Sequence, residues 1–239
     1  MRLEKQDLLF EGASKRLYST GRPSIIVLEF TDEFPGSAAS SKKGKFPGKG
    51  EINCGISSFL FQYLENYHVP THFSERITPT EMTVRKLEMF KIIVHVHNIA
   101  TANLAARFKL DDGRALDYPI IEYYLKAPRL GNPMVNETHA LALGLAKKED
   151  LRTISRIASK TNAILKSLFD RRGLVLLEFQ LEIGSAGDHI CIADEITPDN
   201  CRIWDRKTNR RLDQDRIHQD LGGVEKAYRE LHDRLISAA

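Results

Sequence analysis

Residues 175–196 read Val-Leu-Leu-Glu-Phe-Gln-Leu-Glu-Ile-Gly-Ser-Ala-Gly-Asp-His-Ile-Cys-Ile-Ala-Asp-Glu-Ile. Apolar and polar residues alternate on both sides of a short segment of small and polar residues, 184–188, which is typical of a β-hairpin. The pattern predicts antiparallel strands at 175–183 and 189–196.

Acidic side chains gather on one face of this hairpin. Glu178, Gln180 and Glu182 occupy alternate positions and therefore point to the same side, while Asp194 lies on the opposite strand. Facing carboxylates repel each other unless a cation lies between them. Two such carboxylates together with nucleotide phosphates would suit Mg²⁺, although a solvent-exposed sheet face explains the same pattern.

The rest of the chain indicates an α+β fold. Strands come first and helices follow, without repeated βα alternation, which argues against a doubly wound sheet. Residues 31–50 have neither a helical nor a strand period, and we expect a mobile loop there. Further strands are expected at 8–10, 17–18 and 25–30 and in two runs within 81–97 that break near 88–89, and helices at 51–67, 148–171 and 222–237.

Composition places the chain among ordinary globular proteins. Of its 239 residues 42% are hydrophobic and 28% charged, which disfavours disordered, collagen-like and coiled-coil classes. The net charge of +3 is too small to argue for nucleic acid. Cys54, Cys191 and Cys201 are odd in number and unrelated in spacing, so neither a disulfide framework nor a zinc ribbon is indicated. With no apolar leader or membrane-spanning run, we expect a cytoplasmic protein.

A turn of small residues near the N-terminus is the first candidate phosphate site. Gly12 and Ser14 allow backbone N–H groups to approach phosphate oxygens, and Lys15 adds a positive charge. The turn matches neither the Walker pattern nor the dinucleotide fingerprint. An ordinary hairpin turn with a solvated lysine explains it equally well.

The second candidate follows the acidic hairpin. The run 197–200, Thr-Pro-Asp-Asn, predicts a tight turn that would hold Arg202 rigidly enough to grip a phosphate or carboxylate. The alternative is a simple ion pair of Arg202 with Asp199 or Asp205.

Two histidines on one strand face are a weaker candidate. His95 and His97 could ligate zinc, but no further His or Cys follows at a helpful spacing. We therefore do not expect a metal site there.

Taken together, the motifs resemble the SAICAR synthetase family over essentially the whole chain. The firmest part of the resemblance is Asp194-Glu195-x-x-Pro198-Asp199-x-x-Arg202-x-Trp204-Asp205. Supporting motifs are Gly12-x-x-Lys15, Lys49-Gly50-x-x-Asn53, Pro133-Met134-Val135-Asn136-Glu137, Glu182 with Gly184, Asp215-Arg216 and Leu221-Gly222-Gly223.

The resemblance implies a fold and an activity. It implies an antiparallel-sheet ATP-binding lobe at 1–88, packed on a second α+β lobe at 89–239 with ATP between them. The implied enzyme is an ATP-dependent ligase that joins L-aspartate to carboxyaminoimidazole ribotide through an acyl phosphate. A homodimer is also implied.

The resemblance further assigns residues to the nucleotide half. Lys15, Glu182, Asp194 and Arg202 are the implied catalytic residues, and Glu182 and Asp194 would hold Mg²⁺. The implied ATP-binding residues are Gly12, Ser14, Lys15, Arg85, Leu87, Met89, Lys126, Glu182 and Asp194.

The acceptor half departs from the family pattern. His97 stands in place of a strand arginine, and Ala102-Asn103 in place of Gly-Ser. Other replacements are Ile99, Pro128, Asn132, Gln180 and His218. The implied substrate-binding residues are His97, Asn103, Asn132, Glu178, Gln180, Arg202, Asp215 and His218.

Two alternatives follow from these departures. A paralogous ATP-dependent ligase would act on a different carboxylate, since losing arginine contacts weakens ribotide binding. A non-catalytic nucleotide-binding module would keep the fold alone, but both expected Mg²⁺ carboxylates are present, and folding does not require them. No aromatic and basic interleaving favours RNA, and neither nucleic acid nor membrane is an expected partner.

Overall fold

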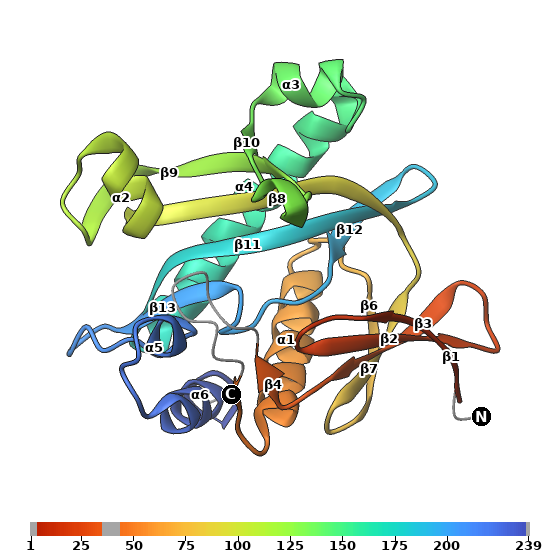
Figure 1. Ribbon diagram of the computed structural model, residues 1–239, viewed down its shortest axis with the longest axis horizontal. Helices are drawn as coiled ribbons and strands as arrows, with labels where there is room; N and C mark the ends of the chain where they lie inside the picture. Colours follow the sequence, from red (N-terminus) through yellow and green to blue (C-terminus); the bar gives the residue numbers. More distant parts are fainter. Residues whose placement is uncertain (1–3, 35–43, 238–239) are drawn as a thin grey trace.

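The computed structural model describes residues 4–34 and 44–237. Two antiparallel sheets lie one above the other with helices around them (Figure 1). This α+β architecture is the one predicted from the sequence.

The first sheet is built almost entirely from the N-terminal third of the chain. Its strand order is β1-β2-β3-β7-β6, and every neighbouring pair is antiparallel. Helix α1 packs against this sheet through apolar residues such as Ile56, Leu60 and Leu64. The elements are β1 (Lys5–Glu11), β2 (Lys15–Thr20), β3 (Ile25–Phe30), α1 (Lys49–Asn66), β6 (Phe73–Thr78) and β7 (Glu81–Arg85).

The second sheet carries the acidic hairpin at its centre. Its order is β10-β9-β8-β11-β12, and β13 also pairs with β11. The long strands β8 and β11 run antiparallel, which sets Glu178 opposite His97 and Glu182 opposite Ile93. The strands are β8 (Glu88–Ala100), β9 (Arg114–Leu125), β10 (Met134–Val135), β11 (Leu174–Ala186), β12 (His189–Ala193) and β13 (Cys201–Asp205).

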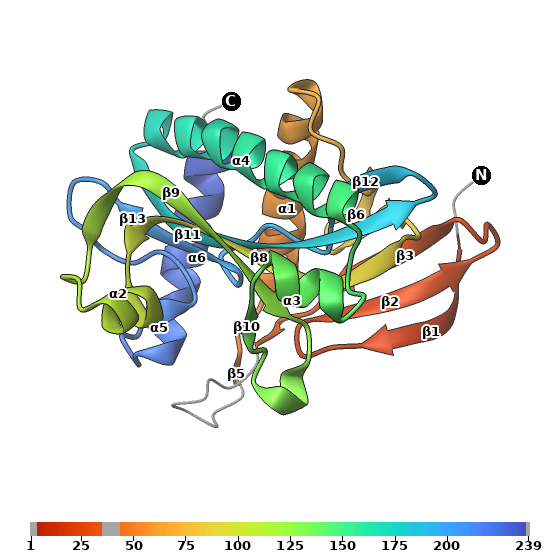
Figure 2. The same cartoon turned by 90° about the horizontal axis from the view of Figure 1, so that it is seen from above.

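Of the remaining helices, one covers the second sheet and another packs against α1 beside the first sheet. Helix α4 (Lys148–Arg171) crosses one face of the second sheet, packing on β11 (Figure 2). Helix α6 (Val224–His232), continued by a π-helical turn, Asp233–Ser237, returns to pack on α1. The shorter helices are α2 (Ala102–Phe108), a 3-10 turn (Pro128–Leu130), α3 (Glu137–Ala142) and α5 (Asp215–His218).

The two sheets meet where β7 gives way to β8. Only Lys86 and Leu87 separate these strands, which belong to different sheets. A second connection is the loop before β6, where Thr71 bridges Ile192 of β12. A cavity between the sheets is therefore bordered by these two short segments, which the neighbouring strands hold in place.

Most of the predicted elements are present, with corrections at their ends. The break expected near 88–89 lies at 86–87, and the strand expected at 189–196 ends at Ala193. The expected loop at 31–50 contains two-residue strands, β4 (Glu33–Phe34) and β5 (Gly44–Lys45), and α1 begins within it at Lys49. Residues 35–43 of that loop lie outside the described residues. No helix of the described chain is long and apolar enough to cross a bilayer.

Candidate active site

A cavity of about 350 Å³ lies between the two sheets. Apolar side chains of the first sheet line one side of it, among them Leu17, Ile26, Leu28 and Val84. Charged side chains line the other side. Among them are Lys15 of β2, Lys126 after β9, Glu182 of β11 and Asp194 after β12, while Arg85 and Lys86 line the cavity at the junction of the sheets. An apolar wall opposite a charged one suits a ligand with a flat ring and a polar tail.

Lys15 of β2 reaches across to the carboxylates that end the hairpin. Its Nζ lies 2.5 Å from Asp194 Oδ1 and 2.7 Å from Glu195 Oε1. Burial alone lowers the pKa of Lys15, but the two carboxylates outweigh it and raise that pKa above its usual range. The ammonium is therefore charged at neutral pH and available to a phosphate.

Lys126 and Glu182 form the second ion pair of the cavity. Lys126 Nζ lies 2.5 Å from Glu182 Oε2. Burial and the charge of Asp194 together raise the pKa of Glu182. Burial also acts to raise the pKa of Asp194, but Lys15 outweighs it and holds that pKa below its usual value. Glu182 and Asp194 therefore repel each other, and a cation between them relieves that repulsion.

These carboxylates fit a Mg²⁺ ion better than a transition metal. No group of three or more His, Cys, Asp or Glu side chains in residues 4–34 and 44–237 is arranged to hold a metal. Mg²⁺ keeps several water or phosphate ligands and needs only one or two carboxylates from the protein. Glu182 and Asp194 meet that requirement when a phosphate chain supplies the rest.

The backbone at the end of β12 positions Asp194. Its φ of 63° lies in the left-handed region that non-glycine residues rarely adopt. The following residues are fixed by hydrogen bonds, because Asn200 Nδ2 donates to the Glu195 carbonyl at 2.7 Å and Thr197 Oγ1 donates to Glu195 Oε2 at 2.8 Å. The expected tight turn is present, with the Asn200 N–H donating to the Thr197 carbonyl at 3.1 Å.

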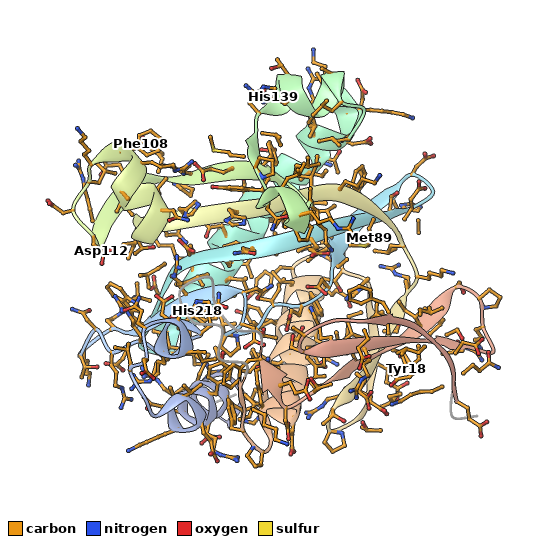
Figure 3. The ribbon with its side chains drawn as sticks, in the orientation of Figure 1. Tyr18, Met89, Phe108, Asp112, His139 and His218 are labelled. Carbon is orange, nitrogen blue, oxygen red and sulfur yellow. The ribbon has the colours of Figure 1, made fainter. Side chains whose placement is uncertain are left out.

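The segment between β7 and β8 forms the rim of the cavity. Arg85, Leu87 and Met89, which the family resemblance assigns to ATP, all line it, and Met89 lies between the two sheets (Figure 3). Gly184 makes this rim possible. A Cβ at that position would lie 2.7 Å from Leu87 Cβ and 3.0 Å from Met89 Sδ.

The turn before Lys15 is closed on itself. The Gly12 N–H donates to the Lys15 carbonyl at 2.8 Å, so Gly12 shapes the turn without lining the cavity. Ser14 lies elsewhere, in a smaller cavity of about 150 Å³ that also contains Glu195 and His218. The structure therefore separates Ser14 from Lys15, although sequence analysis grouped them.

Several residues that the resemblance assigns to the acceptor form a line of alternating charges, called the acceptor line below. The line lies beyond the cavity between the sheets, which is called the nucleotide cavity below because the resemblance implies ATP there. His97 lies between two carboxylates, with Nδ1 3.1 Å from Glu178 Oε2 and Nε2 3.4 Å from Glu122 Oε2. Arg107 of α2 contacts Glu122 at 2.6 Å, and Arg202 of β13 contacts Glu178 at 2.5 Å. The line continues to Asp215, whose Oδ1 accepts a hydrogen bond from Arg202 Nε at 3.0 Å.

The charge on His97 follows from this arrangement. Burial alone lowers the pKa of His97, but hydrogen bonds and charges from Glu122 and Glu178 outweigh it and raise the pKa to about 9. His95, two residues earlier, packs on Tyr124 with ring centroids 4.3 Å apart, and burial lowers its pKa to about 4. One histidine of the pair is thus a cation at neutral pH and the other is neutral.

Arg202 forms neither of the two ion pairs that the sequence suggested for it. Its partners are Glu178 and Asp215 rather than Asp199 or Asp205. Asp199 instead accepts from the buried Lys49 at 2.5 Å. Arg202 therefore belongs to the acceptor line.

The other predicted acceptor residues lie apart from that line. Asn103 is exposed on α2. Asn132 adopts a φ of 49°, and its Oδ1 accepts the Ala127 N–H at 2.9 Å, so it stabilises a turn. Gln180 shares the polar face of β11 with Glu178 and Glu182. His218 faces the smaller cavity.

Several site residues were not predicted from the sequence. His72 lines the nucleotide cavity as a buried neutral imidazole, since burial lowers its pKa to about 4. Glu122 and Arg107 complete the acceptor line, but they come from a strand and a helix that the sequence pattern did not reveal. Glu195 had the clearest signal, because it directly follows Asp194 in the acidic strand.

Comparisons with known proteins agree with this geometry. The family model described as SAICAR synthetase matches residues 8–235. A phosphoribosylaminoimidazole-succinocarboxamide synthase from Desulfitobacterium hafniense (strain Y51) is 42% identical over 233 residues, covering 98% of both chains. The crystal structure of that enzyme from Ehrlichia chaffeensis superposes with a TM-score of 0.92 at 36% identity, covering 96% of this chain and 98% of the other.

A related structure also has a nucleotide bound. A SAICAR synthetase in complex with ADP superposes with a TM-score of 0.91 at 36% identity, over 95% of this chain and 97% of the other. Sequence and structure agree over nearly the whole length, so the chain belongs to the SAICAR synthetase family.

Proposed function

We propose that this protein is an ATP-dependent ligase that joins L-aspartate to the carboxylate of carboxyaminoimidazole ribotide. The observation that carries the proposal is the cavity that brings Lys15, Lys126, Glu182 and Asp194 together opposite an apolar wall. Family membership and the ADP complex of a relative support the same activity. The boundary between its two lobes is proposed at 88/89, next to the junction of the sheets.

The chemistry requires an activated carboxylate. A carboxylate does not condense with an amine directly, so the γ-phosphoryl group of ATP is transferred to it first, forming an acyl phosphate and ADP. The amine nitrogen then attacks the acyl carbon, and phosphate leaves. Lys15 and Lys126 are proposed to hold the phosphate oxygens, while Leu87 and Met89 border the adenine ring. Arg202 is proposed to orient the acceptor for attack.

Glu182 and Asp194 are proposed to hold Mg²⁺. The ion would neutralise charge on the transferring phosphoryl group when it is bound. Lys15 and Lys126 already pair with these carboxylates, so they can turn to the phosphates when the cation arrives.

A second candidate is a ligase with a different carboxylate acceptor. The charge pairing at the acceptor end favours it, because His97, Arg107 and Arg202 all contact carboxylates of the protein. A ribotide phosphate must compete with Glu122 and Glu178 for these cations, whereas an uncharged group at that end need not.

One assay separates these candidates. ADP release is measured with ATP and Mg²⁺ plus carboxyaminoimidazole ribotide and L-aspartate, with each substrate omitted in turn and Glu182→Ala as the inactive control. Turnover that needs both substrates is the expected result. If turnover is absent while ADP still binds, the second candidate replaces the first. If ADP does not bind, both ligase assignments are wrong.

We also propose a cytoplasmic homodimer. The three cysteines are buried free thiols, which suits a reducing compartment. Exposed apolar side chains near α3 supply a surface for a second copy; they are Leu130, Met134, Leu141 and Leu143. Light scattering on the purified protein measures the mass, and a monomer at micromolar concentration would contradict the dimer.

A further inference from the structure

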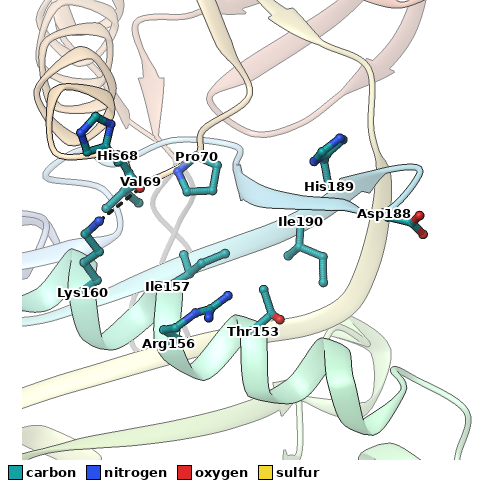
Figure 4. Close-up of a pocket in the computed structure, with 10 residues that line it drawn as sticks. All are labelled: His68, Val69, Pro70, Thr153, Arg156, Ile157, Lys160, Asp188, His189 and Ile190. Atoms are coloured by element: carbon teal, nitrogen blue, oxygen red, sulfur yellow. Dashed lines mark hydrogen bonds between the residues drawn. The ribbon is translucent and has the colours of Figure 1, made fainter.

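A second cavity of about 430 Å³ shares no lining residue with the nucleotide cavity (Figure 4). Three segments enclose it: the loop 68–70 after α1, the middle of α4, and the start of β12. Its volume falls in the range of small-molecule sites, roughly 300–1,000 Å³. The proposed ligase reaction does not use it.

Basic side chains surround the opening of this cavity. Arg156 and Lys160 are one turn apart on α4 and therefore share a face, with His68 and His189 on the facing segments. Lys160 Nζ donates to the His68 carbonyl at 3.3 Å, which ties the loop to the helix. Within the described residues, no hydrogen bond or ion pair engages Arg156.

One carboxylate is present, and it does not neutralise these groups. Asp188 lies at the hairpin end, and its carboxylate points away from Arg156 in Figure 4. Thr153 of α4 also lines the cavity, and its hydroxyl is a further hydrogen-bond donor. The cavity therefore attracts an anion.

The floor of the cavity is apolar. Val69 and Ile157 are buried and Ile190 is half-buried, and all three line the cavity. Ile190 and the exposed Pro70 keep apolar surface that an organic ring would remove from water, whereas a free phosphate ion would not. The lining therefore suits a ligand that carries both an anionic group and a flat organic ring.

We propose that this cavity binds an organic phosphate of nucleoside monophosphate size, with the phosphate between Arg156 and Lys160 and the ring on the apolar floor. The occupant would brace the loop after α1 against β12. Those two segments also reach the nucleotide cavity, since the Ile192 N–H donates to the Pro70 carbonyl at 3.0 Å and the His72 N–H to the Ile192 carbonyl at 2.8 Å. His72 lines the nucleotide cavity directly.

Calorimetry on nucleotide-free protein tests the proposal, and the variants below assign the signal to this cavity. ADP is left out because it carries the same ring and phosphate and would fill this cavity too. The probes are AMP, adenosine and inorganic phosphate. AMP is expected to bind, and each fragment to bind at least about tenfold more weakly, since charged hydrogen bonds and ring burial each contribute. The measurement needs no catalytic turnover, so it is independent of the proposed ligase activity.

The matched variants lie on the same helix. Arg156→Gln with Lys160→Gln is expected to weaken AMP binding at least about tenfold. Arg152→Gln with Lys166→Gln removes the same charge from exposed positions outside the cavity and should leave binding unchanged. The proposal is overturned if AMP does not bind, if both double variants change AMP affinity equally, or if phosphate alone binds as tightly as AMP.

Discussion

At the scale of single residues, His97 places a titratable charge between two carboxylates. Its imidazolium is the only cation between Glu122 and Glu178 in the line described above. Deprotonation would leave two buried carboxylates facing a neutral ring. The charge of His97 therefore contributes to the stability of the fold.

The pH dependence follows from the direction of the shift. A pKa of about 9 in the folded protein exceeds the usual value of 6.5, so the folded state binds the proton more tightly than the unfolded state. Protonated His97 thus adds about 3 kcal/mol at most to the free energy of unfolding. This contribution is complete below pH ~6.5 and is lost as the pH rises towards ~9. Urea unfolding at several pH values should show this loss in the wild type, and His97→Gln should flatten it.

His95 provides the control for that experiment. It lies on the same strand, but its pKa of about 4 keeps it neutral throughout this pH range. His95→Gln should retain the alkaline loss of stability even if the lost packing on Tyr124 lowers the overall free energy of unfolding. An unchanged slope in His97→Gln would show that another group titrates.

Lys49 is the second residue whose charge is central to the fold. Its side chain is fully buried, and its Nζ lies 2.5 Å from Asp199 Oδ2. Asp199 also accepts from Asn53 at 2.9 Å and from Tyr228 at 2.7 Å. Lys49→Met leaves this buried carboxylate without its cation, and such a loss costs about 3–5 kcal/mol.

Denaturant midpoints check the Lys49 prediction. Lys45→Met, at an exposed position of β5, is the matched control and should change stability by no more than about 0.5 kcal/mol. Asp199→Asn combined with Lys49→Met should recover part of the loss, since it removes the unpaired charge. Equal midpoints for Lys49→Met and Lys45→Met would contradict the prediction.

Only part of the candidate active site could be predicted from the sequence. Glu182 and Asp194 were recognisable because alternation on one hairpin places them together. Glu122 and Arg107 were not. The contact of Glu122 with His97 depends on the register between β8 and β9, and the contact of Arg107 with Glu122 depends on the position of α2. Register between distant strands is set by tertiary packing, which a local pattern does not encode.

At the scale of elements, long alternating or amphipathic segments were predicted best. Helix α4 spans 148–171 as expected, because its apolar face recurs at helical spacing. Strand β9 was missed, since its residues are mostly half-exposed and do not alternate. The two-residue strands β4 and β5 carry no pattern at all, which is why 31–50 reads as a loop.

The close contact of β11 with the 86–89 segment predicts that a larger residue at position 184 weakens nucleotide binding. Gly184→Ala places a Cβ 2.7 Å from Leu87 Cβ, so the rim of the nucleotide cavity must move. We expect ADP affinity, measured by calorimetry, to fall about tenfold, which is ~1.4 kcal/mol.

Gly187 supplies the control on the same hairpin. A Cβ there meets nothing within 4 Å, and asparagine tolerates the φ of 60°. Gly187→Asn should therefore bind ADP as the wild type does. Unchanged affinity in Gly184→Ala would show that the rim does not constrain the nucleotide.

At the scale of the molecule, the two sheets share one hydrophobic core. A single cluster of buried residues runs from Leu28 and Phe61 of the N-terminal part to Phe179 and Leu231 of the C-terminal part. The last helix adds a further tie, because Tyr228 of α6 packs its ring on Phe46 and donates its hydroxyl to Asp199. The proposed lobes are therefore not independent folding units.

The shared core predicts one unfolding transition. Trp204, the only tryptophan, lies on β13 and reports on the second sheet, whereas far-ultraviolet circular dichroism reports on the whole chain. Both signals should change at the same urea concentration, because losing either sheet exposes apolar surface of the other. Saturating ADP should move both midpoints upward together. A fluorescence transition separated from the dichroism transition would mean that the sheets unfold independently, with the seam near 88/89 as the boundary between two domains.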